Sequence, residues 1–329
     1  MNLNVKIASR LAVAPMMDWT DRHCRYFHRL LSAQALLYTE MVTSAALVRG
    51  GAHHLLAFDA FEQPVALQLG GADPAELAQA ARIGADHGFT EINLNVGCPS
   101  DRVQSGCFGA VLMREQNRVG DCVAEMAAAC RAEVTVKCRI GVDDQIPQEV
   151  LPRFLETIRA AGVKRVIIHA RKAWLQGLSP KENRDVPPLD YPLVLAMKND
   201  YPDLRICING GIETLDDAEY FLARGLDGVM IGRAAYHHPA RVLAAVDRRI
   251  FGASKTDTDP FSVAEAMRSY IARHLGLGGR LGSVTRHMLG LFSGRPGARA
   301  WRRALSEAPA GDLSDYDHAL SLLTLRAAA

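Results

Sequence analysis

Eight short segments before residue 234 carry the alternating or continuous apolar pattern that is typical of β-strands. They are residues 11–16, 35–41, 64–70, 91–97, 134–140, 165–171, 205–211 and 228–233. Between them lie stretches with the apolar spacing of amphipathic helices, such as residues 74–87, 116–131, 147–161 and 214–224. Repeated β-α units of this kind predict a (β/α)8 TIM barrel, and an open doubly wound sheet is the alternative that periodicity leaves open.

The composition changes after the last predicted strand. Residues 251–260 are polar and rich in turn-forming residues, which predicts a linker. From Phe261 onward the strand pattern disappears, and Leu, Ala and Arg dominate. We therefore expect an α/β barrel domain over residues 1–250 and a helical domain over residues 261–329.

The overall composition is ordinary for a soluble globular protein, because 49% of the 329 residues are hydrophobic and 22% are charged. No apolar run approaches the roughly 18–20 residues that span a bilayer, and the N-terminal segment lacks the apolar core of a signal peptide. Seven scattered cysteines without a CxxC spacing favour neither a disulfide framework nor a metal site. We expect a cytoplasmic monomer that binds neither metal nor membrane. A net charge of +2 by itself indicates no class of partner.

Polar and charged residues stand at or beyond the ends of most predicted strands. In (β/α)8 barrels the chemistry lies on the rim formed by the carboxyl ends of the strands, so these residues predict a functional pocket there. They are Asp18, Gln68, Asn93, Asn95, Cys98, Lys137, Arg139, His169, Arg171, Asn209, Gly210, Gly211, Gly232 and Arg233.

Lys137 and Arg139 lie two residues apart and therefore point to the same face of their strand. A buried lysine is costly without a partner, so Lys137 forms either a structural ion pair or a contact with a bound group. His169 on the next predicted strand is open to two similar interpretations, a histidine satisfied within the core or a functional side chain.

Glycines follow the last two predicted strands, in Asn209-Gly210-Gly211 and in Gly232-Arg233. Such turns can direct backbone N–H groups toward a phosphate, and phosphate sites in these barrels favour strands seven and eight. Together with the lysine and the histidine, they favour a cofactor that carries phosphate.

Cys98 stands between Gly97 and Pro99, directly after the fourth predicted strand. Pro99 has a fixed φ and biases Cys98 away from helix, so the thiol has a defined direction at the rim. This placement suits a proton donor or a nucleophile, whereas a cysteine that only packs in a turn is the alternative. Cys107 is a competing candidate, but it lacks the position at a strand end.

Seven motifs occur in a fixed order along the chain: APMMDWTDRHCR (14–25), QLGG (68–71), NLNVGCPSDRVQSGCFGAVLM (93–113), VKCRIG (136–141), IIHAR (167–171), INGGI (208–212) and IGRAAY (231–236). Together they resemble the flavin-dependent tRNA-dihydrouridine synthases, and the likeness extends over essentially the whole chain. Residues 16–21 are similar to the subfamily that acts on U20 and U20a of the tRNA D-loop.

The resemblance implies a TIM barrel that binds FMN, with NADPH as the reductant and a tRNA uridine as the substrate. It further implies that reduced flavin gives hydride to C6 of the uracil and that Cys98 protonates C5. The residues implied at the flavin are Pro15, Met16, Met17, Gln68, Lys137, His169, Asn209, Gly210, Gly211, Gly232 and Arg233. On the substrate side the resemblance places Asn95 and Arg139.

Between Ala266 and Ser306 there are eight arginines and no acidic residue. On a helix, Arg295, Arg299 and Arg302 or Arg303 share a face, which predicts a basic stripe for tRNA phosphates. A merely solvated helix face is the alternative. In the family the loop at 172–188 reaches toward the RNA, which implicates Arg184 together with Arg299 and Arg302.

Three other functions remain open from the sequence. The first is a flavin oxidoreductase acting on a free pyrimidine or another small enone-like substrate, against which the arginine-rich tail argues. The second is a non-redox aldolase or lyase that uses Lys137 as a Schiff base. The third is an RNA-binding module without catalysis.

Overall fold

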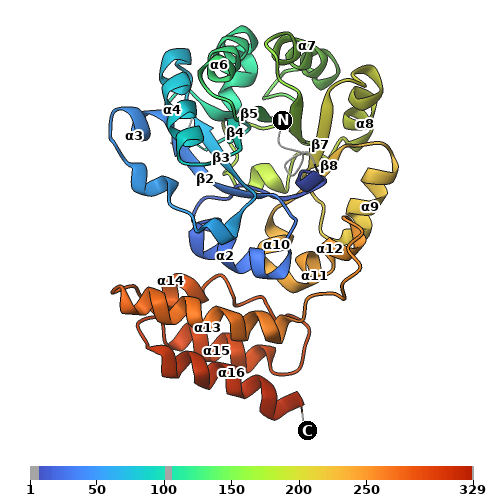
Figure 1. The fold of residues 1–329 in the computed structure, drawn as a ribbon. Helices are drawn as coiled ribbons and strands as arrows, with labels where there is room; N and C mark the ends of the chain where they lie inside the picture. Colours follow the sequence, from blue (N-terminus) through green and yellow to red (C-terminus); the bar gives the residue numbers. More distant parts are fainter. Residues whose placement is uncertain (1–6, 101–105, 328–329) are drawn as a thin grey trace.

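The computed structural model describes residues 7–100 and 106–327, and eight parallel strands form a barrel at its centre (Figure 1). The strands are β1 (Leu11–Val13), β2 (Leu37–Thr43), β3 (Val65–Gly70), β4 (Glu91–Val96), β5 (Glu133–Arg139), β6 (Arg165–His169), β7 (Arg205–Asn209) and β8 (Gly228–Ile231). Each strand from β2 to β8 pairs in parallel with the next, and β8 pairs with β1. Between β1 and β2, the Val13 N–H donates to the Leu36 carbonyl at 2.9 Å, and the Leu36 N–H donates to the Leu11 carbonyl at 3.0 Å. The predicted (β/α)8 barrel is confirmed, and the open-sheet alternative was wrong.

Helices surround the barrel (Figure 1). They are α2 (Arg22–Leu31), α3 (Ser44–Val48), α4 (Pro74–Asp86), α6 (Gln116–Ala129), α7 (Pro147–Ala160), α8 (Tyr191–Asp200), α9 (Leu215–Ala223), α10 (Arg233–His237), α11 (Pro239–Leu243) and α12 (Val246–Arg249). Short 3-10 helices also lie in the loops of the described residues: η1 (His53–Leu56), η2 (Ala60–Glu62), η3 (Gly109–Arg114) and η4 (Glu182–Arg184). The start of α4 illustrates how the sequence sets these ends. Pro74 is its first residue, and the side chain of Asp73 accepts from the Glu76 N–H at 2.7 Å.

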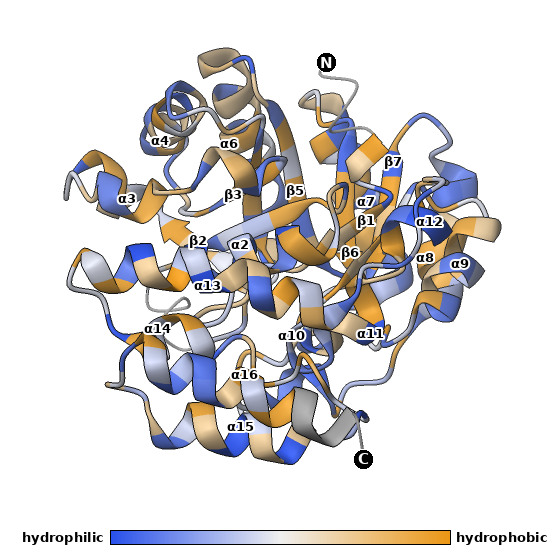
Figure 2. Ribbon diagram, turned by 60° about the horizontal axis from the view of Figure 1, so that its bottom comes forward, coloured by the Kyte–Doolittle hydropathy of each residue, from blue (hydrophilic) through white to orange (hydrophobic). Residues whose placement is uncertain are grey.

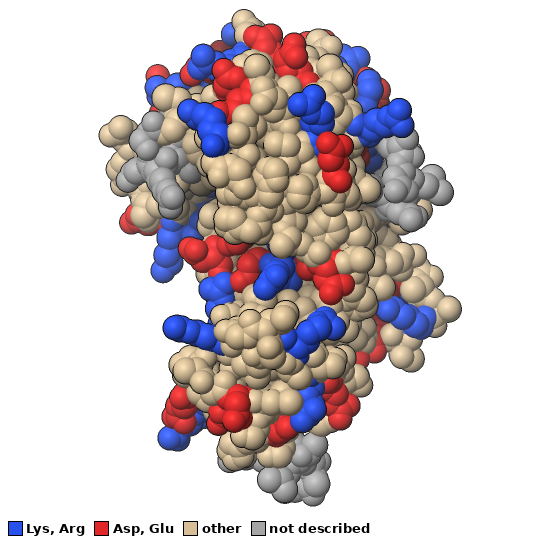
Figure 3. Space-filling model, turned by 60° about the vertical axis from the view of Figure 1, so that its left-hand side comes forward, with Lys and Arg blue, Asp and Glu red and all other residues tan. Residues whose placement is uncertain are grey.

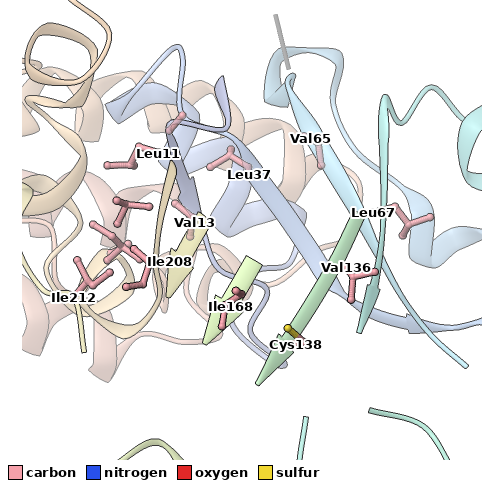
Figure 4. Close-up of a cluster of buried hydrophobic side chains, with 14 of the residues drawn as sticks. Leu11, Val13, Leu37, Val65, Leu67, Val136, Cys138, Ile168, Ile208 and Ile212 are labelled. Carbon is pink, nitrogen blue, oxygen red and sulfur yellow. The ribbon is translucent and has the colours of Figure 1, made fainter. Parts of the chain in front are cut away.

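The apolar core lies between the outer face of the barrel and the helices (Figure 4). On β5, Val136 and Cys138 are fully buried in this core. Their neighbours Thr135, Lys137 and Arg139 point into the barrel, because successive side chains of a strand face opposite sides. The alternation seen in the sequence therefore decides which side chains can reach a site inside the barrel.

A buried cluster of charges fills the amino-terminal end of the barrel. Arg165 forms ion pairs with Glu91 and Glu133, and Arg205 pairs with Glu133. The Tyr38 hydroxyl donates to Glu91 at 2.5 Å. Because each charge has a partner of opposite sign, the cost of burying it is offset.

Four further helices pack against one side of the barrel (Figure 1). They are α13 (Pro260–Gly276), α14 (Leu281–Thr285), α15 (Ala298–Glu307) and α16 (Leu313–Ala327). Helices α13 and α14 contact α2, and α15 packs on α16. In Figure 2 these helices carry both hydrophobic and hydrophilic residues, and their buried apolar side chains, such as Trp301, belong to the same cluster as those of the barrel. The division into two domains with a linker at 251–260 stays a prediction.

One part of the predicted arginine stripe was wrong. Helix α15 begins at Ala298, after Gly297 with φ +83°, so Arg295 lies in the preceding turn and not on the helix. Its guanidinium approaches Asp259 at 3.9 Å. Arg299 and Arg302 do lie on α15 and are exposed. In the described part of the chain, no helix is both long and apolar enough to cross a membrane.

Candidate active site

A cavity of about 1090 Å³ opens at the carboxyl ends of the strands, where the sequence predicts a pocket. Its volume slightly exceeds the roughly 300–1,000 Å³ that small-molecule sites usually occupy. Predicted residues from around the barrel line it: Pro15, Met16, Met17, Gln68, Asn95, Cys98, Lys137, Arg139, His169, Arg184, Asn209, Gly210, Gly211, Gly232 and Arg233. Arg299 and Arg302 do not line it; they lie on the exposed side of α15.

Cys98 lies in the turn after β4, is partly exposed, and lines the cavity. The Asn95 side-chain oxygen accepts from the backbone N–H groups of Gly97 and Cys98, each at 3.0 Å, which fixes this turn. The Cys98 sulfur lies 3.5 Å from Ser100 Oγ. The thiol is therefore accessible from the cavity and is not packed into the core. Cys107 is exposed and is not among the described residues that line the cavity.

Lys137 enters the cavity from β5 as a cation without a counter-charge. No carboxylate or hydrogen-bond acceptor pairs with it among residues 7–100 and 106–327. Burial, together with the smaller effect of the neighbouring charge of Arg139, lowers the pKa of Lys137 to about 8. A half-buried amine without such a partner favours the second interpretation of this residue, a contact with a bound group.

His169 presents a second unsatisfied group in the same region. Its Nδ1 is buried and has no hydrogen-bond partner among the described residues. Burial, followed by the charges of Arg139 and Lys137, holds the pKa of His169 well below its ordinary value, so the ring is neutral at pH 7. Depending on its tautomer, the free nitrogen of this neutral imidazole can accept a hydrogen bond from a ligand or donate one to it.

Glycine is required at two places beside this histidine. Gly210 has φ +107°, and a Cβ there would come within 3.1 Å of the His169 ring. Gly211 has φ +67°, and a Cβ there would collide with Leu189 and Tyr191 at 2.6 and 2.7 Å. At Gly232, by contrast, a Cβ would find ordinary van der Waals distances. Neither the backbone conformation nor the neighbouring atoms therefore require glycine at position 232, which leaves open space next to the cavity.

Hydrogen bonds and ion pairs of charged residues connect separate segments of the cavity rim. Arg139 donates to the backbone carbonyls of Gly97 at 3.2 Å, Lys172 at 3.2 Å and Asn183 at 2.9 Å. Arg184 lines the cavity, and Arg233 pairs with Asp185 at 2.8 Å. Arg139 therefore has a structural task in addition to the predicted one, because it connects the Cys98 turn to the 172–188 loop.

Some lining residues were not predicted from the sequence. Trp19 stacks on Tyr236 with ring centroids 4.5 Å apart, and Glu40 of β2 faces the same cavity. Burial and the nearby charge of Asp21 raise the pKa of Glu40. The motif at residues 14–25 contained Trp19 and Asp21, but it gave no sign of which side chains turn toward the cavity.

Asp21 joins this rim to the C-terminal helices. Its carboxylate accepts from Arg286 at 2.6 Å and lies 3.0 Å from His287 Nε2, and it also caps α2 through the His23 and Cys24 N–H groups. Although burial raises the pKa of Asp21, the bond to His287 and the other donors hold it well below its ordinary value. Asp21, which lines the cavity, therefore connects the cavity rim directly to the C-terminal helical region.

Comparison with protein-family models matches residues 12–320 to the family described as dihydrouridine synthase (Dus). The chain belongs to the dihydrouridine synthase family. It is 56% identical over 324 residues to the tRNA-dihydrouridine(20/20a) synthase of Escherichia coli K12, covering 97% of this chain and 93% of the relative. It is 59% identical over 301 residues to the protein of the same name from Salmonella typhi, covering 91% of this chain and 90% of the relative.

A solved structure of a 2-naphthoyl-CoA reductase in complex with 2-naphthoyl-CoA has the same fold. The TM-score is 0.53 at 13% identity, over 70% of this chain and 48% of that chain. At this identity the likeness concerns the fold alone. The family resemblance that the motifs predicted is thus confirmed, whereas the tasks of individual residues in this dihydrouridine synthase stay predictions.

Proposed function

We propose that this protein is a flavin-dependent tRNA-dihydrouridine synthase that reduces the C5–C6 bond of uridines 20 and 20a in the tRNA D-loop, with NADPH as the reductant. The observation that carries this proposal is the identity of 56% over 97% of the chain to a tRNA-dihydrouridine(20/20a) synthase. The accessible thiol at the cavity rim supports it, because the reaction needs an acid at that place.

The cavity residues fit FMN. His169 Nδ1 is buried and Lys137 is half-buried, and neither has a partner among the described residues, so both are expected to meet a ligand. In our proposal the ring is held by Pro15, Met16, Met17, Gln68, Lys137 and His169, and the phosphate end by Asn209, Gly210, Gly211, Gly232 and Arg233. When bound, reduced FMN supplies the hydride that adds to C6 of the uracil.

The protein supplies the proton and the electrostatic support. Hydride addition at C6 leaves negative charge on the C5–C4–O4 part of the ring, and Cys98 neutralises it by giving its S–H proton to C5. The thiolate formed is then reprotonated from solvent, to which this partly exposed residue has access. The Lys137 ammonium stabilises negative charge on the cofactor.

The substrate base must leave its stack to enter a cavity at the mouth of a barrel. Extrusion costs a few kcal/mol, which contacts to the RNA backbone must offset. We assign these contacts to Arg184 on the loop after β6 and to Arg299 and Arg302 on α15. Asn95 and Arg139 remain substrate-side residues in this proposal, although both also hold the Cys98 turn.

One observation favours a second function, a Schiff-base lyase. A lysine whose pKa is lowered to about 8 is suited to attack a carbonyl. The absorbance of the purified protein distinguishes the two functions, because a protein with bound flavin absorbs near 450 nm and a flavin-free lyase does not. A protein that stays colourless after FMN addition and dialysis would favour the lyase.

The proposed activity is tested with purified protein, FMN, NADPH and a tRNA transcript that lacks dihydrouridine. We expect NADPH oxidation that depends on the tRNA, and a mass increase of two hydrogens at positions 20 and 20a. Equal NADPH oxidation with free uracil, together with no salt-sensitive tRNA binding, would replace this proposal by a reductase of free pyrimidines.

A further inference from the structure

A line of buried hydrogen bonds runs along the barrel interior, and its lower half begins at the charged cluster. Thr135 Oγ1 donates to Glu91 Oε1 at 2.7 Å, and Asn93 Nδ2 donates to Thr135 Oγ1 at 2.8 Å. Glu91 is itself held by Arg165 and by the Tyr38 hydroxyl. Glu91, Thr135 and Asn93, which form this lower half, are fully buried, so water does not compete for these bonds.

The upper half of the line reaches the turn that carries Cys98. Gln68 Nε2 donates to Asn93 Oδ1, and Asn95 Nδ2 donates to Gln68 Oε1, each at 2.8 Å. Asn95 Oδ1 then accepts from the N–H groups of Gly97 and Cys98 at 3.0 Å. We call the five side chains of the line the interior network; they are Glu91, Thr135, Asn93, Gln68 and Asn95.

The two ends of the interior network fix the direction of every bond in it. Backbone N–H groups at the upper end can only donate, and the carboxylate of Glu91 at the lower end can only accept. Each amide between them has one orientation that satisfies both neighbours. A flipped amide would set two donors or two acceptors against each other inside the barrel, which is costly where no water can intervene.

We propose that Asn93 and Thr135 are positioning residues for the reaction, which hold the Asn95 amide in the orientation that fixes the Cys98 turn. They lie below the cavity and are not among its described lining residues, so they act through Gln68 and Asn95. The inference rests on the proposed function in one respect, that Cys98 is the proton donor.

The fixed direction also determines what the cavity floor offers to a ligand. Gln68 and Asn95 both line the cavity, and each amide oxygen is already used by a donor within the protein. The second N–H of each amide remains for a ligand, and so does one lone pair of the Gln68 oxygen, which accepts a single bond, whereas the Asn95 oxygen accepts two. With two free donors and one free acceptor position, this part of the floor fits chiefly hydrogen-bond acceptors, such as the carbonyl oxygens of a flavin or a uracil.

Three variants of β5 test the proposal. Thr135→Val keeps the shape and removes the hydroxyl, and Thr135→Ser keeps the hydroxyl. Val136→Ala is the matched control, since it creates a cavity in the outer core and leaves the interior network intact. If Thr135→Val does not fold, Asn93→Ser, whose side chain is too short to bond both neighbours, is measured instead.

Two readouts separate positioning from plain stability. The first, which needs no activity, is hydrogen–deuterium exchange of the peptide covering residues 94–100. The second is a pair of single-turnover rates, flavin reduction by NADPH and flavin reoxidation by tRNA. For Thr135→Val we expect exchange of the Gly97 and Cys98 amides to rise and reoxidation by tRNA to fall, each by about tenfold. We expect flavin reduction and tRNA affinity to change by less than about twofold, and Thr135→Ser to behave as wild type.

The proposal is overturned if Thr135→Val leaves exchange and reoxidation unchanged, or if Val136→Ala with a similar loss of Tm reproduces both effects. Equal slowing of both half-reactions would also overturn it, because that is the result of general damage. Failure of the proposed function has a different signature. Wild-type flavin would then not be reoxidised by tRNA, while the exchange readout would still decide whether Thr135 fixes the Cys98 turn.

Discussion

At the scale of single residues, Cys98 owes its position to a neighbouring amide and not to packing of its own side chain. The Asn95 oxygen holds the two N–H groups of the turn, and Arg139 holds the carbonyl of Gly97. The thiol itself stays partly exposed at the rim. A proton donor must reach its substrate in one geometry, and these bonds fix the backbone while leaving the sulfur accessible.

We expect Cys98→Ala to bind FMN and tRNA as the wild type does and to lose about 10²–10⁴-fold in turnover, because the general acid is gone. Reoxidation of reduced flavin by tRNA, followed by its absorbance, measures the loss. Cys107→Ala is the control, since this exposed thiol is outside the cavity lining. Equal losses in both variants would show that Cys98 has no special task.

Lys137 predicts a pH dependence of cofactor binding. With a pKa lowered to about 8, the side chain is a cation at pH 7 and loses its charge as the pH rises above 8. We expect the affinity for the anionic FMN to fall by several-fold between pH 7 and pH 9, and this fall to be much smaller in Lys137→Met. Quenching of flavin fluorescence on binding gives both affinities. A fall of the same size in the variant would assign it to another group.

The sequence predicted those residues whose placement follows from local alternation. Lys137, His169 and Cys98 reach one cavity because period-two patterning and strand ends are visible in the chain itself. The link from Asp21 to Arg286 and His287 could not be predicted, because it joins residues more than 260 positions apart without any periodic signal. The cap that Asn95 places on the Cys98 turn was also missed, since an asparagine near a ligand and one that caps a turn look alike in a sequence.

At the scale of elements, α2 is the contact between the barrel and the C-terminal helices. His23 of α2 lies 2.7 Å from the Tyr270 hydroxyl of α13 through its Nδ1, and its ring packs edge-on against His274 at 4.5 Å. Burial lowers the pKa of His23 to about 4, and only the charge of Asp21 opposes this shift among the larger influences. The imidazole is therefore neutral in the folded protein.

This buried histidine makes stability depend on pH. Its folded pKa is below the unfolded value of about 6.5, so the unfolded chain binds more protons at acidic pH. Its contribution is fully present above pH 6.5 and is lost progressively as the pH falls toward 4. We expect Tm to drop between pH 7 and pH 5, and the drop to be smaller in His23→Phe. An unchanged drop would assign the effect to other groups, such as the buried His28.

Helix α15 carries the surface arginines to which we assign tRNA contacts. Arg299 and Arg302 are exposed and have no acidic partner among the described residues, whereas Arg303 pairs with Glu307 and Arg268 pairs with Asp317. On the face of the molecule in Figure 3, basic and acidic side chains are interspersed over the surface. The arginines that α15 can offer to phosphates are therefore Arg299 and Arg302, because the others named here are already paired with carboxylates.

We expect Arg299→Ala and Arg302→Ala each to weaken tRNA binding and to reduce the salt slope by about one. The effect should be uniform across tRNA sequences, because phosphate contacts carry no sequence information. Arg268→Gln on α13 is the control and should bind tRNA as the wild type does. Unchanged affinity and slope in both α15 variants would remove the helix from the proposed RNA surface.

At the scale of the whole molecule, barrel and C-terminal helices share one apolar core. Buried residues of α13 to α16, including Met267, Trp301 and Tyr316, belong to the same cluster as the outer face of the barrel. Polar contacts join the same surface, because Asp21 binds Arg286 and His287. Large apolar interfaces of this kind suppress independent motion of the parts.

We therefore expect thermal unfolding in a single transition, with the calorimetric enthalpy equal to the van't Hoff enthalpy. Tryptophan fluorescence should report the same midpoint, because Trp19 lies at the cavity rim and Trp301 in the C-terminal helices. Two resolved transitions would instead support the two separable domains that the sequence predicts. Either result decides how far the boundary near residues 251–260 divides the chain.

The three carbonyls that Arg139 holds have a mechanical consequence. One belongs to the turn of the acid, and the other two belong to the loop that our proposal turns toward the RNA. The guanidinium of Arg139 therefore connects the two segments, and a movement of one segment strains the hydrogen bonds to the other. If tRNA docks on this loop as we propose, we expect any displacement of the loop to move the Cys98 turn as well, so that substrate binding and the placement of the thiol are coupled.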